Sequence, residues 1–294
     1  MTDSSIWSRV TVMKKKTKII IISLLIIVAV VSSFVVIREY NGRQKEKNEF
    51  VHLAKITETS YEEPSADSVP EESEVIFKES SEPESAEESS EAYDEEMSET
   101  TAINENQTVS YQPHSVQDLI DMNPDCFGWI SIAGTNISYP VMHTPYDSQK
   151  YLHRSFYGEY SFSGVPFLDY RCTKESDNLI IYGHHMNDGS MFADLCNYAD
   201  ESYCKNHQVV ILETENEAAE YQVFSVMLVS CYDDWYLFTD AGTDENYDEQ
   251  IEYAKTHSLY DTGIVPQNRR QILSLSTCTN RSEDGRILVL AVKN

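Results

Sequence analysis

Two segments near the C-terminal end of the chain decide its fold: RQILSLSTC at 270–278 and RILVLAVKN at 286–294. Both are rich in the branched apolar side chains that strands favour. The connection at 279–285 contains Asn, Ser, Asp and Gly, which are typical of turns. We therefore predict an antiparallel hairpin, in a register that places Cys278 opposite Arg286.

This register gives the hairpin two different faces, because successive side chains of a strand point to opposite sides. One face is almost wholly apolar and is expected to pack on the core: Leu273, Leu275, Thr277, Ile287, Val289 and Ala291. The other face carries Ser274, Ser276 and the Cys278–Arg286 pair. The core is thus expected on the side away from Cys278.

The Cys278–Arg286 pair suggests covalent chemistry. A neighbouring guanidinium lowers the pKa of a thiol and can stabilise an oxyanion that forms at the sulfur. A buried structural cysteine beside a surface arginine is the alternative interpretation, since free cysteines are so often buried. The hairpin alone leaves both interpretations open.

Five upstream segments also have the composition of strands and are separated by Gly, Asn, Asp or Pro. They lie at 127–132, 137–141, 179–182, 209–214 and 221–231. Helices are expected at 115–123 and at 246–259, the second inside the long connection before the cysteine strand. The pattern predicts a mainly β fold, an antiparallel barrel or sandwich, with the second helix as a wall or lid of a site.

The segment NLIIYGHHM at 178–186 is a second candidate for chemistry. It is typical of a buried strand that stops at Gly183 and presents His184 and His185. A histidine near a thiol makes the nucleophile–base pair of acyl transfer, and a hydrogen-bonded structural histidine is the alternative. Adjacent histidines point to opposite sides of an extended chain, and no other cluster has ligand spacing. We therefore expect no metal and no cofactor.

The start of the chain predicts a membrane anchor. Residues 1–18 are basic, and residues 19–37 contain nothing more polar than serine. A helix of that length spans roughly 30 Å, the hydrocarbon thickness of a bilayer. A cleaved signal peptide is the alternative, although its apolar stretch is usually only about 7–15 residues long. We expect a single-pass anchor with 1–18 in the cytoplasm and the bulk of the chain outside the cell.

A linker is expected at 38–112, much of it composed of Glu, Ser, Pro and Thr. Its like charges repel and it has few apolar side chains, so it predicts a disordered, extended tether. Its role is either to hold a domain away from the membrane or to act as a solubilising tail. The net charge of the whole chain, −27, argues against a nucleic-acid partner, which requires a basic face.

The six cysteines are irregularly spaced and include no CxxC pair. An even number outside the cell invites a disulfide framework. The expected domain at 113–294 is large enough to fold without one, so we predict free thiols that are mostly buried.

Seven motifs, in order, resemble those of the sortases, and most closely those of the class B sortases, membrane-anchored cysteine transpeptidases of Gram-positive cell surfaces. The resemblance covers roughly 113–294. It rests on NPDCFGWI at 123–130, YPV at 139–141, GVPFLD at 164–169, YGHH at 182–185, GSMF at 189–192, LSTC at 275–278 and GR at 285–286. Each motif is weak alone, whereas their order behind a predicted anchor is specific.

The resemblance implies a closed sortase-type β-barrel and assigns roles by position. Cys278 is the implied nucleophile and His184 the implied general acid and base. Arg286 would bind the substrate and the oxyanion, assisted by a backbone N–H near Thr279. His185 matches the second, usually non-catalytic histidine of the class.

The resemblance also implies a groove with Ser276, Thr277 and Thr279 as candidate lining residues. The implied reaction cleaves an LPxTG- or NPxTx-like sorting signal through a thioacyl intermediate and transfers the protein to an amine. The implied partners are secreted proteins that bear the signal, a peptidoglycan-precursor or pilin amine, and membrane lipid around the anchor. A cysteine peptidase that uses water, or a non-catalytic surface binding domain, remains as an alternative.

Overall fold

The computed structural model describes residues 3–59, 115–279 and 282–294. The helices are α1 (Asp3–Thr59), α2 (Val116–Met122), η1 (Lys150–His153), η2 (Ala193–Ala199), α3 (Glu201–Asn206), η3 (Asp234–Leu237) and α4 (Asp244–Thr256). The strands are β1 (Cys126–Ser131), β2 (Ser138–Met142), β3 (Phe167–Leu168), β4 (Asn178–Tyr182), β5 (Val209–Thr214), β6 (Ala218–Ser230), β7 (Ile272–Cys278) and β8 (Gly285–Lys293).

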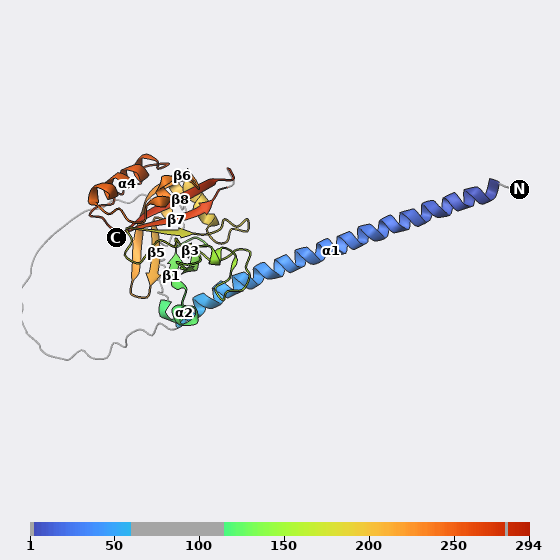
Figure 1. The fold of residues 1–294 in the computed structure, drawn as a ribbon, viewed down its shortest axis with the longest axis horizontal. Coiled ribbons are helices and arrows are strands. Elements are labelled where there is room, and N and C mark those ends of the chain that lie inside the picture. Colours follow the sequence, from blue (N-terminus) through green and yellow to red (C-terminus); the bar gives the residue numbers. More distant parts are fainter. Residues whose placement is uncertain (1–2, 60–114, 280–281) are drawn as a thin grey trace, which may run out of the picture. The chain divides into compact units, whose positions relative to one another are not determined.

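The strands close into a barrel in the order β1-β2-β3-β4-β7-β8-β6-β5 (Figure 1). The expected β-barrel is therefore confirmed. The barrel is mixed rather than purely antiparallel, because β2 pairs in parallel with β3 and β4 with β7. The sequence pattern missed β3, since its two residues are too few to show a period.

The hairpin β7–β8 has the predicted register, with Cys278 opposite Arg286 and Leu275 opposite Val289. The face away from Cys278 lies in the main hydrophobic core, as expected. The Cys278 face is buried as well along most of its length. A second core covers this face there, and it includes Trp235 of η3, Phe238 directly after η3 and Ile251 of α4.

The connection between β6 and β7 supplies this cover. It contains the expected helix, α4, which begins earlier than predicted because the Thr243 hydroxyl accepts a hydrogen bond from the backbone N–H of Asn246. Before it, the indole N–H of Trp235 donates to the hydroxyl of Ser274 at 3.0 Å. The connection between β6 and β7 thus covers the polar face of β7 and leaves only the Cys278 end of that strand uncovered.

The predicted start of the linker, residue 38, is wrong because it lies inside helix α1. The chain was expected to lose structure at residue 38, but it remains helical to Thr59. Phe50 and Leu53 are buried in the main core, and Glu46 accepts a hydrogen bond from the backbone N–H of Phe162. These tertiary contacts stabilise a helix end that sequence composition had assigned to the linker. The rest of the predicted linker, 60–112, lies outside the described residues.

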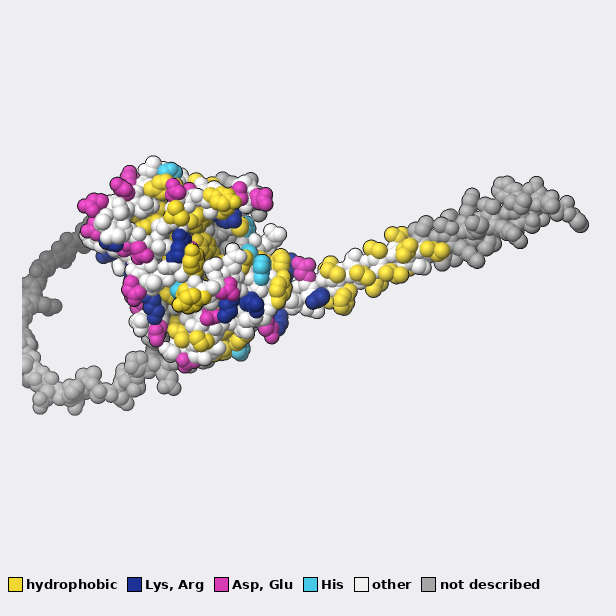
Figure 2. Space-filling view, in the orientation of Figure 1, with side chains coloured by type: hydrophobic (Ala, Val, Ile, Leu, Met, Phe, Trp, Pro, Cys, Tyr) yellow, Lys and Arg dark blue, Asp and Glu magenta, His cyan; other side chains and the backbone are white. Residues whose placement is uncertain are grey.

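The N-terminal part of α1 has the opposite character. Its apolar side chains are exposed, for example Ile22 at 55% and Ile37 at 57%, and they form a long apolar surface (Figure 2). Within the described residues, Ile22–Ile56 is long and apolar enough to cross a membrane, with a mean hydropathy of 2.3.

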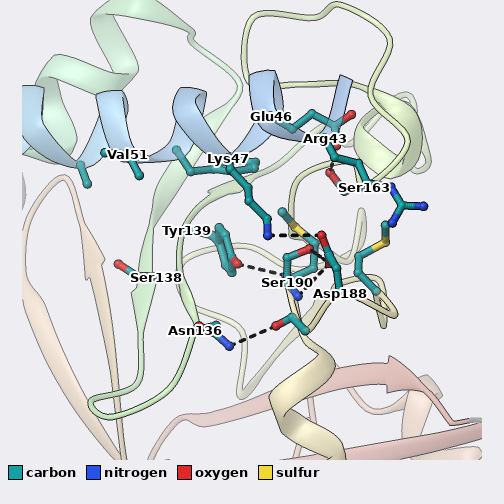
Figure 3. A pocket seen from close by; sticks show the side chains of 15 residues that line it. Arg43, Glu46, Lys47, Val51, Asn136, Ser138, Tyr139, Ser163, Asp188 and Ser190 are labelled. Atoms are coloured by element: carbon teal, nitrogen blue, oxygen red, sulfur yellow. Dashed lines mark hydrogen bonds and ion pairs between the residues drawn. The ribbon is translucent and has the colours of Figure 1, made fainter. Parts of the chain in front are cut away.

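A pocket of about 360 Å³ separates the C-terminal part of α1 from the barrel; we call it the helix pocket (Figure 3). Apolar side chains such as Phe50 and Tyr139 line it, and their rings meet edge to face at 5.1 Å between centroids. Lys47 of α1 reaches across to Asp188 at 3.5 Å.

Candidate active site

A groove of about 440 Å³ opens on the side of the barrel where β4 and β7 end and β8 begins. His184, Cys278 and Arg286 all line it, although they are far apart in the sequence. Its other lining residues are Ser148, Gln149, Leu152, Phe167, Asp169, Tyr170, Tyr182, Gly183, Cys231, Tyr236, Ser276 and Thr277. The structure therefore brings the three main candidates together.

Cys278 is the last residue of β7 and is exposed to solvent. Its sulfur is accessible because the roof formed by the insertion stops short of the strand end. The backbone beneath it is held firmly, since the hydroxyl of Thr277 donates to the carbonyl of Gly183 at 2.8 Å. The alternative of a buried structural cysteine is thereby excluded.

The parallel pairing of β4 with β7 brings His184 close to Cys278. Tyr182 pairs with Ser276, and the N–H of Gly183 donates to the Ser276 carbonyl at 3.1 Å. His184 follows directly and therefore leaves the sheet beside the end of the cysteine strand. Gly183 itself is required there, because a Cβ would lie 2.6 Å from the ring of Phe192.

The imidazole of His184 is half-buried and held by η1. Its Nε2–H donates to the carbonyl of Leu152 at 3.0 Å, and its ring stacks on His153 with centroids 5.3 Å apart. Burial lowers the pKa of His184, and a charge on His153 lowers it further, while the Leu152 carbonyl acts in the opposite direction. The neutral imidazole with its proton on Nε2 is therefore favoured, which leaves Nδ1 as a proton acceptor.

Arg286 lies opposite Cys278 in β8 and opposite Val229 in β6. One of its terminal nitrogens, Nη1, donates to the carbonyl of Gly285 at 2.9 Å and to that of Glu283 at 3.3 Å. Among the described residues no carboxylate forms an ion pair with it, and no hydrogen bond joins it to Cys278 or His184. The guanidinium can thus offer further donors to a group bound in the groove.

A polar network that the sequence did not predict forms the floor of the groove. Asp169 is 6% exposed, and its carboxylate accepts two hydrogen bonds of 2.8 Å from the Arg171 guanidinium and one of 2.9 Å from the Tyr182 hydroxyl. Burial alone would raise the pKa of Asp169, but these bonds hold that pKa below its ordinary value. Its only sequence signal was its place at the end of the GVPFLD motif.

The same network supports the roof of the groove. Arg171 donates to the backbone carbonyl of Tyr236 at 2.5 Å, and the Tyr236 ring stacks on Tyr182. Burial raises the pKa of Tyr236 to about 12, so its hydroxyl stays protonated and bonds the Ser276 hydroxyl at 2.8 Å. The network fixes η3 to the barrel wall.

The structure separates the three predicted groove residues. Ser276 and Thr277 line the groove, but Thr279 is not among its described lining residues. Its side chain lies in the β7–β8 turn, where a Cβ on Gly285 would lie 2.5 Å from the Thr279 hydroxyl. Its backbone N–H already donates to the Gly285 carbonyl at 2.9 Å. Thr279 thus lies in the turn that directly follows Cys278, and a role for it in the groove stays a prediction.

His185 points to the other side of β7. Its Nδ1–H donates to the backbone carbonyl of Cys278 at 3.1 Å, and Cys196 Sγ lies 3.4 Å from the same nitrogen. His185 is absent from the groove lining and acts on the backbone of Cys278 rather than on its thiol. Within the described residues, no group of three or more His, Cys, Asp or Glu side chains is arranged to hold a metal ion.

The six cysteines, all of them among the described residues, form no disulfide bond. Three are buried: Cys126, Cys172 and Cys204. Cys196 and Cys231 are half-buried, and Cys278 alone of the six is exposed. Cys231 is the second sulfur that borders the groove.

Comparison with known proteins shows which family has this fold and this site. The model of the sortase domain matches residues 130–294. The chain belongs to the sortase family. Curated relatives include sortase B of Listeria monocytogenes, 33% identical over 59% of this chain and 72% of that protein, and sortase B of Staphylococcus aureus, 30% identical over 60% and 73%.

Solved structures of sortases agree with this assignment. A Staphylococcus aureus sortase B–substrate complex has a TM-score of 0.57 at 30% identity, over 61% of this chain and 84% of that one. A Bacillus anthracis sortase B in complex with AAEK1 has a TM-score of 0.55 at 34% identity, over 60% and 82%. The class B resemblance is confirmed, and this sortase is a cysteine transpeptidase of the membrane-associated, cell-surface kind, a family that acts on sorting signals and amine acceptors.

Proposed function

We propose that this sortase uses Cys278, His184 and Arg286 to cleave an LPxTG- or NPxTx-like sorting signal and to transfer the cleaved protein to an amine. The main support is that these three side chains, from three strand ends, line one groove with an exposed thiol among them. A nucleophile, a base and an oxyanion-stabilising cation are the groups that acyl transfer requires.

The first half-reaction forms a thioester. His184 first accepts the proton of the Cys278 thiol on Nδ1, which gives the thiolate and the imidazolium. Cys278 Sγ then attacks the carbonyl carbon of the Thr–Gly-type peptide bond, and the negative charge moves to the carbonyl oxygen. Arg286 donates to that oxygen. The C–N bond then breaks, and His184 as imidazolium gives its proton to the leaving amine.

The second half-reaction releases the product. His184, now neutral, removes a proton from the incoming amine, whose nitrogen attacks the thioester carbonyl. The C–S bond breaks, a new amide forms, and Cys278 leaves as the thiolate. Because Nε2 of His184 donates to Leu152, Nδ1 is the nitrogen that exchanges protons with substrate.

The substrate and the acceptor are proposed from relatives. One solved relative is a sortase B–substrate complex, and another is a sortase B complexed with a glycine tripeptide. We propose a sorting-signal peptide as the acyl donor, and a peptidoglycan-precursor or pilin amine as the acceptor. A glycine amine and a lysine side-chain amine represent these two acceptor classes.

We also propose a single-pass anchor at 19–37, with 1–18 in the cytoplasm and the catalytic domain, 113–294, outside the cell. The exposed apolar surface of α1 and the hydropathy of that helix support it (Figure 2). The acidic segment that follows α1 would then lie outside the membrane, where its repelling charges favour an extended spacer.

Mass spectrometry of the thioacyl enzyme tests the proposal. The full chain in detergent is mixed with LPxTG- and NPxTx-type peptides, with and without triglycine or Nα-acetyl-lysine, and the adduct is mapped by proteolysis. We expect an acyl group on Cys278, lost on addition of the preferred amine as the aminolysis product appears. Cys278→Ala should form no adduct.

The second groove sulfur provides the internal control. An adduct on Cys231 instead of Cys278, or turnover by Cys278→Ala, would remove Cys278 from the mechanism. If the thioacyl enzyme forms but yields only the acid with every amine, water is the acceptor and the chain acts as a peptidase under these conditions.

A further inference from the structure

The short helix η1 contacts His184 at two successive residues. The carbonyl of Leu152 accepts the hydrogen bond from His184 Nε2, and the imidazole of His153 stacks on the His184 ring at an interplanar angle of 26°. One contact fixes which nitrogen carries the proton, and the other restricts rotation of the ring. No other described residue stacks on His184.

His153 is itself held from its far side. The ring of Tyr160 stacks on it with centroids 6.5 Å apart and planes at 25°. The order Tyr160–His153–His184 is thus a stack of three rings that runs from the surface to the groove. Tyr160 is 78% exposed, and His153 is exposed as well.

His153 does not line the groove, whereas its neighbour Leu152 does. A substrate in the groove therefore touches Leu152 and His184 but is not expected to touch His153. His153 is instead stacked between two rings, those of Tyr160 and His184. The arrangement acts on His184 and not on the ligand.

We propose that His153 is a positioning residue for His184: its imidazole holds the His184 ring in the orientation that presents Nδ1 to the groove. The inference rests on the proposed role of His184 as general acid and base. It adds a residue that neither the sequence motifs nor the groove lining identifies.

His153 also acts electrostatically. When it is protonated it disfavours a second positive charge on His184, in the same direction as burial. The other titratable or charged groups that share the groove with His184 are Asp169, Tyr170, Tyr182, Cys231, Tyr236, Cys278 and Arg286. All of these remain when His153 is replaced, so a change in the His184 titration reports on the loss of His153.

Two substitutions separate stacking from charge. His153→Phe keeps an aromatic ring over His184 and removes the charge, whereas His153→Ala removes both. We expect the pKa of His184 to rise in both variants. We expect kcat to fall about tenfold in His153→Ala but to stay within about threefold in His153→Phe, with KM within about twofold in each.

The His184 titration is measured by NMR on full chain in detergent with ¹³C-labelled histidine, the signal being assigned by its loss in His184→Gln. The same titration is repeated in proteins that also carry Cys278→Ala, so that turnover cannot affect the result. If the proposed function fails, the pKa change persists without any activity to measure. If only the positioning role fails, the protein with His153→Ala keeps the kcat of the unchanged protein.

Tyr160→Ala is the matched control for local loss of structure at this surface. It removes the Tyr160 ring, which is the outermost of the stack, and leaves His153 in place. We expect its effect on kcat to be smaller than that of His153→Ala. The inference is overturned if His153→Ala leaves kcat unchanged, whether or not the His184 pKa moves, or if it raises KM without lowering kcat. It is also overturned if His153→Phe loses as much kcat as His153→Ala.

Discussion

The groove and the helix pocket are hollows of similar size, about 440 and 360 Å³, with very different contents. In the helix pocket charged side chains have polar partners: Lys47 pairs with Asp188, and Glu46 accepts from the Ser163 hydroxyl at 2.7 Å. In the groove, as far as the described residues go, a thiol, an imidazole and a guanidinium meet without any bond between them. The volume of a hollow therefore does not show which of the two is the active site. The groove is distinguished by reactive side chains that remain available to a ligand.

With the nucleophile Cys278 left in place, the largest expected effect within the groove is that of His184→Gln. Glutamine keeps a polar side chain of similar reach but cannot exchange a proton near neutral pH, so we expect kcat to fall by about 10²–10⁴-fold. Steady-state kinetics with a sorting peptide measures it. A loss below tenfold would mean that another group transfers the proton.

Arg286→Ala is expected to lower kcat/KM by about 10²–10³-fold, because it removes the donor proposed for the oxyanion. The matched variant Arg286→Lys keeps the charge but loses the planar fork, and should recover only part of the activity. Full recovery by lysine would indicate that charge alone matters. No loss in Arg286→Ala would remove the residue from the mechanism.

In the helix pocket, Phe50→Ala should affect stability rather than chemistry. Phe50 is 8% exposed and packs on Tyr139, so its truncation is expected to reduce stability by about 3 kcal/mol. Hydrogen exchange of the full chain in detergent should show faster exchange in the C-terminal part of α1, while kcat per folded molecule stays within twofold. A large fall in kcat would mean that the two hollows are coupled.

Asp169→Asn should weaken the groove floor by about 1–3 kcal/mol, because Arg171 and Tyr182 lose a charged acceptor. The pKa of Asp169 is lowered in the folded state, so the stability it contributes is present above the ordinary aspartate pKa and is lost as the pH falls through the folded-state value. Thermal unfolding of both proteins should therefore differ at pH 7 and converge below about pH 4. A constant difference across that range would contradict this origin.

The smallest effect is expected for Lys47→Met. Its partner Asp188 is 3.5 Å away, and the lysine side chain is 49% exposed, so the pair is worth less than about 1 kcal/mol. Melting temperature and kcat should both stay close to those of the unchanged protein. A marked loss of activity would assign the helix pocket a role in the reaction.

Local patterns predicted much of the barrel and part of the site. The alternation in 270–278 and 286–294 was enough to place Cys278 opposite Arg286, because strand register is set by which face is apolar. The strand ahead of His184 and the helix in the insertion were likewise visible in composition. The turn that begins at Thr279 was visible as well, because the residues after Cys278 are typical of turns.

The other features of the fold and the site cannot be predicted from a local sequence pattern. They depend on contacts between segments that meet only after folding. The parallel pairing of β4 with β7 brings His184 to Cys278 across almost a hundred residues of chain, and η1 places His153 on the His184 ring. The helical continuation of α1 is stabilised by burial of Phe50 and Leu53 against the barrel rather than by its own composition. Periodicity within a segment reports which of its faces is apolar, whereas the partner for that face is chosen by tertiary packing.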